Sequence, residues 1–188
     1  MDKTYADTVR LLLAVAPDVF ANDIFAMKGG TAINLFVRDM PRLSVDIDVV
    51  YLPWQTPRDE ALQAINQELA AIATRVAPLG VQTRLVRAKD LGDTKLIVEN
   101  DASQVKIEVN VVFRGSVLPV ERRPLSAKTS DLFGVEFELP VLAPDELYAS
   151  KLVAALDRQH PRDLFDVWQL FESGDLHVHI SGLEARWD

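Results

Sequence analysis

The sequence contains no cysteine, which excludes disulfide bonds and thiolate zinc sites. It also lacks an apolar run long enough to span a bilayer, although 48% of its 188 residues are hydrophobic. The first residues, Met1 to Asp7, have neither the basic start nor the apolar stretch of a secretory signal. Apolar residues are numerous enough for one compact core, and we expect a cytoplasmic protein without membrane contact.

Basic residues are in the minority, with 20 Lys and Arg against 28 Asp and Glu and a net charge of −8. A protein that binds nucleic acid mainly by neutralising phosphates has the opposite balance. The densest cationic stretch contains Arg114, Arg122, Arg123 and Lys128. An ordinary solvated face is the simpler interpretation of that stretch, and a local acceptor-binding surface is the alternative.

The hydrophobic patterns predict an α+β or mixed α/β protein, in which helices flank a mixed central sheet. The expected helices cover residues 5–16, 32–37, 57–76, 144–156 and 161–171. Pro17 is expected to end the first of them, and Thr56 to Asp59 to form a capping box for the third. The expected strands cover residues 24–27, 45–51, 81–86, 95–98, 105–113 and 135–139, and residues 114–134 are expected to be irregular.

Two aspartates in one predicted strand give the clearest functional signal. Asp46 and Asp48 are two residues apart, so a strand directs both carboxylates to one face with their Cα atoms about 6.5–7 Å apart. Two adjacent acids repel each other unless a cation neutralises them, and oxygen ligands of this kind suit Mg²⁺ or Mn²⁺. The alternative is a solvated sheet face on which aspartate is tolerated, although aspartate is disfavoured in strands.

A second predicted strand carries another acid. Lys106, Glu108 and Asn110 share one face of residues 105–113, and the apolar residues share the other. If this strand lies beside the first, Glu108 supplies a third carboxylate to the same metal site. An ordinary amphipathic strand with an exposed polar face explains the pattern equally well.

Two glycines stand between the first predicted strand and the short helix that follows it. Gly29, Gly30 and Thr31 precede the strand with the two aspartates. Glycine allows close approach to the backbone, and amides at a helix start attract phosphate. This order of turn, helix and acidic strand would hold a triphosphate on amides and its reactive phosphates on metal.

Lys28 to Ala32, followed by Arg42 and Ser44 to Asp48, resembles the first motif of the AbiEii/AbiGii (MenT-like) nucleotidyltransferase toxins, a family of the polymerase-β-like nucleotidyltransferase superfamily. Lys151 to Leu156, Arg158, and Arg162 to Val167 resemble its later lysine and Arg-Asp motifs. The resemblance covers residues 24 to 172. It implies a nucleotidyltransferase core in residues 1–140 and a helical segment, residues 141–188, that carries the later motifs. Because family members usually have a longer helical C-terminal region, we expect a minimal or truncated member.

The residue patterns and the resemblance together give a set of candidate site residues. The catalytic set is Asp46, Asp48, Lys151 and Asp163, the metal set is Asp46, Asp48 and Glu108, and the nucleotide-binding set is Lys28, Gly29, Gly30, Thr31, Ser44 and Lys151. Lys151 lies in a predicted helix among apolar neighbours, where its ammonium needs a partner. Asp163 is favoured over Asp166, although an acid in the first turn of a helix is stabilising whatever its function. The apolar residues Leu164, Val167, Trp168 and Phe171 are expected to pack inward.

The function implied by the resemblance is transfer of a nucleoside monophosphate from a metal-bound triphosphate to RNA, in some members the 3′ end of tRNA, by a toxin that a separate antitoxin restrains. One alternative keeps the chemistry but uses a small molecule such as an aminoglycoside, or a protein hydroxyl, as the acceptor. Another is a degenerate nucleotide-binding or partner-binding module without catalysis. His160, His177 and His179 form no metal pattern and are expected to be solvated.

Overall fold

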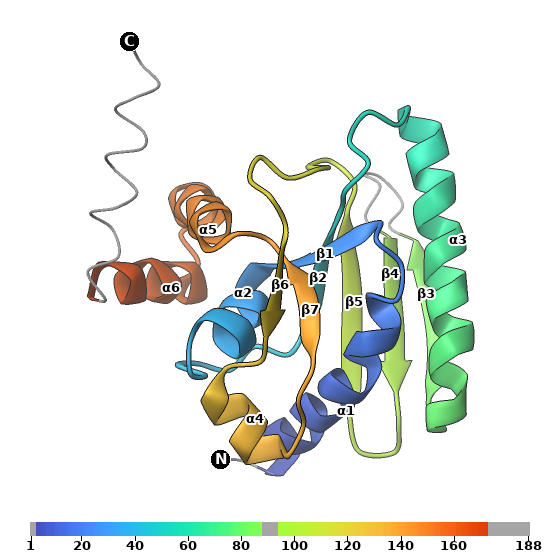
Figure 1. The fold of residues 1–188 in the computed structure, drawn as a ribbon, viewed down its shortest axis with the longest axis horizontal. Helices are drawn as coiled ribbons and strands as arrows, with labels where there is room; N and C mark the ends of the chain where they lie inside the picture. The colour runs from blue at the N-terminus through green and yellow to red at the C-terminus, as the bar shows by residue number, and fades with distance from the viewer. Residues whose placement is uncertain (1–2, 88–93, 173–188) are drawn as a thin grey trace. The chain divides into compact units, whose positions relative to one another are not determined.

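The computed structural model describes residues 3–87 and 94–172 of the chain (Figure 1). Two compact units divide the chain, Met1–Leu142 and Ala143–Asp188, which we call unit 1 and unit 2. Unit 1 contains the sheet, and the described part of unit 2 contains two helices. Among the described residues, no helix combines the length and the apolar character that a membrane crossing requires. His177 and His179 lie outside the described residues.

The described strands of unit 1 form one seven-stranded mixed sheet in the order β3-β4-β5-β2-β1-β7-β6. The strands are β1 (Phe25–Lys28), β2 (Ile47–Tyr51), β3 (Gln82–Arg87), β4 (Thr94–Glu99), β5 (Gln104–Asn110), β6 (Glu121–Pro124) and β7 (Glu138–Val141). The pairs β2–β5 and β1–β7 are parallel, and the other neighbours are antiparallel. The predicted mixed sheet is therefore confirmed. It brings β2, the strand with Asp48, to the centre.

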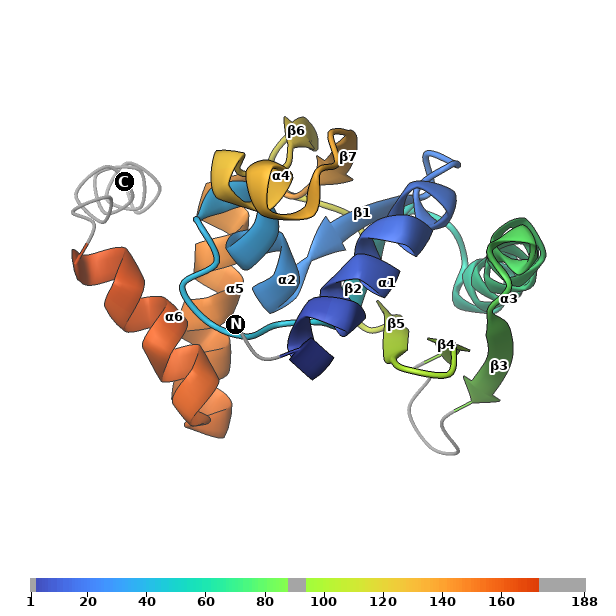
Figure 2. The same ribbon diagram turned by 90° about the horizontal axis from the view of Figure 1, so that it is seen from below.

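Two long helices, α1 (Lys3–Val19) and α3 (Arg58–Val76), contact each other and cover one face of β5 and β4 (Figure 2). Val9, Leu12, Ile65 and Ile107 are fully buried in the resulting core. The expected end of the first helix at Pro17 was wrong, because α1 continues to Val19 with the proline inside its last turn. A proline so close to a helix end costs less than one in the middle, since few hydrogen bonds follow it.

The start of α3 also differs from the prediction. Pro57 is the N-cap residue, and no side chain caps the helix there, so the predicted capping box does not form. Asp59 and Glu60 instead place negative charge in the first turn, which favours the positive end of the helix dipole. After α3, the 3₁₀ turn η2 (Ala77–Leu79) ends at Gly80 in the left-handed conformation.

The strand β5 ends at Asn110 rather than at residue 113. The Asn110 side chain accepts hydrogen bonds from the backbone amides of Val112 and Phe113, and these amides are then turned away from the sheet ladder. Asn100 accepts from Ala102 and Ser103 in the same way, and this interaction closes the predicted hairpin between β4 and β5. Local bonds of asparagine therefore set both ends of β5.

The segment 114–134 was predicted to be irregular, and this prediction was wrong. It contains β6 and the helix α4 (Ala127–Phe133). Ser126 caps α4 by accepting from the amide of Thr129, and Gly134 ends it with φ 65°. The predicted strand 135–139 is observed three residues later, as β7, because β6 pairs with Glu138 to Val141.

The remaining described helices lie after β1 and in unit 2. After β1 comes the single turn α2 (Gly29–Ala32), which continues as the π-helix η1 (Ile33–Val37). In unit 2, α5 (Pro144–Arg158) and α6 (Pro161–Glu172) pack against each other. Both helices begin at proline with an acid in the first turn, and Arg158 lies in the last turn of α5. The predicted helices in this part of the chain are confirmed.

Candidate active site

A row of charged residues crosses the central strands of unit 1. Lys28 of β1 lies opposite Asp48 of β2, and Asp48 lies opposite Glu108 of β5. Lys95 of β4 ends the row opposite Glu108. Ile47 and Val49 on either side of Asp48, and Ile107 and Val109 on either side of Glu108, are buried, so the pleat directs both carboxylates to the face opposite α1 and α3. Two carboxylates thus lie side by side between two lysines.

The lysines balance the repulsion between the two acids. The Lys95 Nζ atom lies 2.6 Å from a carboxylate oxygen of Glu108, and the Lys106 Nζ atom lies 3.5 Å from the same oxygen. Partial burial acts to raise the pKa of Glu108, but the hydrogen bond from Lys95 and the charges of both lysines outweigh it and lower the pKa. Glu108 is therefore ionised at neutral pH and is already neutralised by side chains.

Asp46 occupies a different setting from Asp48. It precedes the first residue of β2, and the Lys106 Nζ atom lies 3.6 Å from its carboxylate. Within residues 3–87 and 94–172, no three or more acidic or histidine side chains are gathered where they could hold one metal ion. The three carboxylates predicted to bind metal, those of Asp46, Asp48 and Glu108, are thus not gathered around one point, because the lysines draw Glu108 to themselves.

The two glycines of the first motif make room for charged side chains. Gly29 has φ +79°, and a Cβ atom there would collide with the Asp48 carboxylate. A Cβ atom on Gly30 would collide with the Arg42 guanidinium and lie 2.9 Å from the Ser44 hydroxyl. The predicted close approach to the backbone at these glycines is therefore made by residues of the chain itself.

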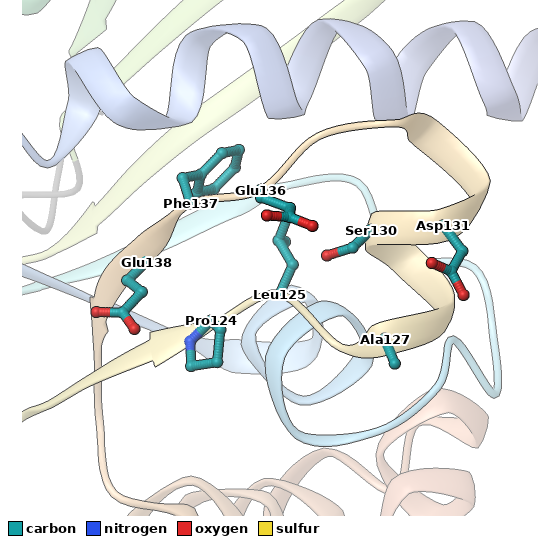
Figure 3. Close-up of a pocket in the computed structure, with 8 residues that line it drawn as sticks. All are labelled: Pro124, Leu125, Ala127, Ser130, Asp131, Glu136, Phe137 and Glu138. Atoms are coloured by element: carbon teal, nitrogen blue, oxygen red, sulfur yellow. The ribbon is translucent and has the colours of Figure 1, made fainter.

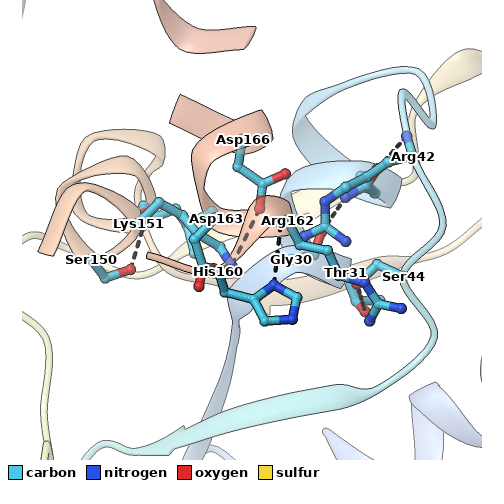
Figure 4. Close-up of polar contacts among 12 residues, drawn as sticks. Gly30, Thr31, Arg42, Ser44, Ser150, Lys151, His160, Arg162, Asp163 and Asp166 are labelled. Atoms are coloured by element: carbon cyan, nitrogen blue, oxygen red, sulfur yellow. Dashed lines mark hydrogen bonds and ion pairs between the residues drawn. The ribbon is translucent and has the colours of Figure 1, made fainter. Parts of the chain in front are cut away.

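Hydrogen bonds fasten the loop between η1 and β2 to this turn (Figure 4). The Thr31 hydroxyl is fully buried and lies 3.1 Å from the Ser44 hydroxyl. Asn34 donates to the Gly30 carbonyl and accepts from the Arg42 amide. Thr31 thus supports Ser44 from inside the protein. Asn34 carries no recognisable signal in the sequence, whereas Arg42 belongs to the first motif.

Unit 2 contains a second, buried charge cluster. The Lys151 Nζ atom lies 3.0 Å from Asp163 and 3.3 Å from Asp166. The Arg158 guanidinium lies 2.9 Å from the other oxygen of Asp163. Lys151 is 9% exposed, Asp163 4% and Asp166 2%. The lysine and the aspartates therefore hold one another in fixed positions between α5 and α6, as the close-up shows (Figure 4).

The acids of α6 face inward, contrary to the prediction for this helix. Leu164, Trp168 and Phe171 are each at least half exposed, although they were expected to pack inward. The reason is the buried ammonium of Lys151, which requires carboxylate partners on the facing helix. Asp163, Asp166 and Leu170 form the buried stripe of α6 at positions i, i+3 and i+7.

The electrostatics of Asp163 follow from these partners. Burial acts to raise the pKa of Asp163, but the hydrogen bond from Lys151 and the charges of Lys151, Arg158 and His160 together lower it. His160 accepts a hydrogen bond from the Arg162 amide through Nδ1, and its carbonyl accepts from the Asp163 amide. Asp163 is thus a fixed negative charge that holds Lys151.

Comparison with protein families matches residues 10–186 to "Nucleotidyl transferase AbiEii toxin, Type IV TA system". The chain belongs to the AbiEii nucleotidyltransferase toxin family. The earlier resemblance is confirmed, and it extends over nearly the whole chain. A search of the curated proteins finds no match to this AbiEii family member.

A solved structure supports the fold of this family member. The chain is similar to MenT4, a nucleotidyltransferase toxin from Mycobacterium tuberculosis H37Rv, with 23% identity and a TM-score of 0.57. The match covers 88% of this chain and 59% of MenT4, so the chain spans about three fifths of the length of that protein. It is also similar to the antibiotic-resistance factor ANT(2'')-Ia, with 17% identity, coverage of 100% and 95%, and a TM-score of 0.49. The predicted nucleotidyltransferase fold is confirmed.

A hollow elsewhere in unit 1 of this AbiEii family member contains none of the predicted site residues (Figure 3). Its volume is about 490 Å³, and its lining consists of Pro124, Leu125, Ala127, Ser130, Asp131, Glu136, Phe137 and Glu138. None of the residues of the family motifs lines it, so we assign no part of the nucleotide site to it.

Three basic residues of the predicted cationic stretch donate hydrogen bonds to different segments of this AbiEii family member. Arg114 donates to the Thr56 carbonyl, and Lys128 donates to the Asp39 carbonyl. Arg122 donates to the carbonyl of Glu138 in β7. Three of the four basic residues thus donate to carbonyls of the chain itself, and both interpretations of the stretch stay predictions.

Proposed function

We propose that the chain is a metal-dependent nucleotidyltransferase that transfers a nucleoside monophosphate from a nucleoside triphosphate to an RNA acceptor. The observation that supports this most directly is the packing of the Asp48 carboxylate against Gly29, beside Gly30. This packing sets an acidic side chain on the turn that the family motif assigns to phosphate. Residues 1–140 would form the nucleotidyltransferase core, and residues 141–188 would carry the lysine and Arg-Asp motifs.

Asp46 and Asp48 are the residues that would hold the metal. Mg²⁺ or Mn²⁺ fits a pair of carboxylates, because these ions keep water and substrate phosphate as their remaining ligands. When bound, the ion would neutralise the phosphates and lower the pKa of the acceptor hydroxyl. Glu108 forms ion pairs with Lys95 and Lys106 in the present arrangement, so it is not a metal ligand there. Its negative charge would instead offset the positive charge of these two lysines beside the metal.

Lys28, Gly29, Gly30, Thr31 and Ser44 would form the phosphate-binding turn. The glycines keep this turn free of side chains, and Thr31 holds the Ser44 hydroxyl in place. Lys151 would supply positive charge to the triphosphate as pyrophosphate leaves. Asp163 would orient the Lys151 ammonium, because it accepts a hydrogen bond from that group at 3.0 Å.

The biological role that the family supports is that of the toxin in a type IV toxin–antitoxin pair. We propose that the RNA acceptor is tRNA, modified at its 3′ end, and that a cognate antitoxin protein restrains the enzyme. Transfer to a small molecule or to a protein hydroxyl is the second candidate. The net charge of −8 favours it, because an acidic surface repels RNA.

The test is incubation of the purified protein with each labelled nucleoside triphosphate, Mg²⁺, and either total tRNA, cellular protein or an aminoglycoside. We expect label on tRNA with wild type and none with Asp48→Ala. Label on protein or on the small molecule would replace the RNA proposal with the second candidate. No transfer to any acceptor, together with equal growth of bacteria that express wild type or Asp48→Ala, would overturn the proposed activity.

A further inference from the structure

We propose that Arg42 is a phosphate ligand of the nucleotide site and that Asn34 is the positioning residue that sets it there. This inference rests on the proposed function, whose site it makes more specific. It assigns roles to two residues outside the set expected from the sequence. The ligand chemistry is that of an oxyanion, such as a phosphate of a nucleoside triphosphate.

Asn34 joins the loop between η1 and β2 to the glycine turn. The side chain is fully buried, donates from Nδ2 to the Gly30 carbonyl at 2.7 Å and accepts through Oδ1 from the Arg42 amide at 3.1 Å. Its own carbonyl accepts from the Met40 amide at 3.0 Å. A primary amide can donate and accept at once, whereas an ionised aspartate only accepts. Asn34 is therefore suited to hold both segments in one arrangement.

Arg42 lies against the backbone of the glycine turn as a result. Its guanidinium occupies the space that a Cβ atom on Gly30 would need, beside the Ser44 hydroxyl. It also donates from Nη1 to the Leu43 carbonyl at 2.9 Å, which limits its rotation. A planar guanidinium held in this way presents a permanent positive charge in a fixed orientation, and this group binds phosphate in a bidentate manner.

The two consecutive glycines each lie against a side chain of opposite charge. Gly29 makes room for the Asp48 carboxylate, and Gly30 makes room for the Arg42 guanidinium. Adjacent Cα atoms are about 3.8 Å apart, so both groups lie against the same turn of the backbone. A phosphate that shares a metal ion with Asp48 would therefore also meet a cation.

A residue of the first helix supports the same arrangement. Tyr5 is buried, and its hydroxyl lies near the backbone of Ser44. Burial raises the pKa of Tyr5, and the positive charge of Arg42 acts against this rise.

The experiment measures binding of inorganic tripolyphosphate by calorimetry, with Mg²⁺ present, to wild type, Arg42→Gln and Arg84→Gln. Arg84 is an exposed residue of the edge strand β3, so the control removes the same charge elsewhere. We expect Arg42→Gln to weaken binding about tenfold or more, as loss of a charged hydrogen-bonding group does, and Arg84→Gln to change it less than twofold. Equal binding by the two variants, or no binding by wild type, would overturn the assignment of Arg42.

A double-mutant cycle tests the positioning role of Asn34. If Asn34 acts through Arg42, its replacement by alanine weakens tripolyphosphate binding strongly in wild type and little in Arg42→Gln. Losses that simply add would show that Asn34 has a general structural role. Asn34→Asp, which has nearly the same shape, gives the same readout if the alanine variant does not fold. This binding assay needs no acceptor, so a missing transferase activity refutes the proposed function without deciding the role of Arg42.

Discussion

The two charge clusters of this protein differ most in their exposure to solvent. Lys95, Lys106, Asp46 and Glu108, on the sheet face of unit 1, have side chains that are 28% to 42% exposed. In unit 2, the side chains of Lys151, Asp163 and Asp166 are 1% to 11% exposed. Exposed ion pairs contribute little to stability and rearrange easily, whereas removing one partner of a buried group is costly.

This difference in exposure suggests different roles for the two clusters. The carboxylates and lysines of the sheet face are partly exposed, and we expect a bound metal or phosphate to change how they pair. The helical pair in unit 2 fixes one ammonium with two carboxylates, and this arrangement resists change. We therefore expect changes on the sheet face to alter activity more than stability, and changes in the buried cluster to alter stability as well.

The largest effect is expected for Asp48→Asn. Loss of a metal-binding carboxylate should lower the rate of nucleotide transfer by about a thousandfold or more, since positioning and charge stabilisation supply most of the rate. The free energy of unfolding should stay within about 1 kcal/mol of wild type, because the change also removes repulsion with Glu108. Transfer assays and urea unfolding of the same preparations measure both quantities. A large loss of stability with unchanged activity would show that the sheet face has the structural role that we assign to the buried cluster of unit 2.

The next effect is expected for Asp166→Ala. This change removes one carboxylate from the buried Lys151 and should lower the free energy of unfolding by about 3 kcal/mol, because an ammonium is left under-compensated. Urea unfolding of this variant is compared with that of Asp7→Ala. Asp7 forms an exposed pair with Arg10, and we expect a change below about 1 kcal/mol there. Similar losses in the two variants would contradict the distinction between exposed and buried pairs.

A smaller effect is expected for Gly29→Ala. Position 29 has φ +79°, and the new Cβ atom would displace the Asp48 carboxylate. The backbone strain should lower the free energy of unfolding by about 1–2 kcal/mol, and displacement of Asp48 should lower nucleotide transfer more strongly. Gly134→Ala is the matched control, since it has φ +65° and open space around its Cβ position. An equal effect of both changes on transfer would show that Asp48 is not displaced.

The sequence predicted those features that depend on pattern and spacing. The alternation of residues 105–109 put Glu108 on the polar face, and the register then placed it beside Asp48. The lysine and Arg-Asp motifs fell on helices as expected. Features set by single hydrogen bonds were missed, such as the end of β5 at Asn110 and the start of α4 at Ser126. Such bonds depend on geometry that one sequence does not reveal.

The orientation of α6 was missed for a different reason. Its pattern has two candidate buried stripes, one apolar and one with Asp163 and Asp166, and hydrophobicity alone selects the first. The choice depends on the buried lysine of the neighbouring helix, which is a tertiary interaction. Asn34 was missed in the same way, because both of its side-chain hydrogen bonds reach groups in other elements or turns.

The smallest effect is expected for Asp163→Asn, and it concerns how the free energy of unfolding depends on pH below neutrality. The pKa of Asp163 is lowered in the folded protein, so the folded state favours its ionised form. Stability from this group is present above the unfolded pKa of about 3.9 and is lost as the pH falls through the lower, folded pKa. Asp163→Asn should therefore be less stable than wild type at pH 7, and this gap should shrink below about pH 4. Urea unfolding from pH 7 to pH 3 measures the gap, and Asp7→Asn serves as the exposed control. A gap that stays constant would mean that the ionised carboxylate of Asp163 stabilises unit 2 no more than an amide does, and the fixed charge attributed to it would have to be withdrawn.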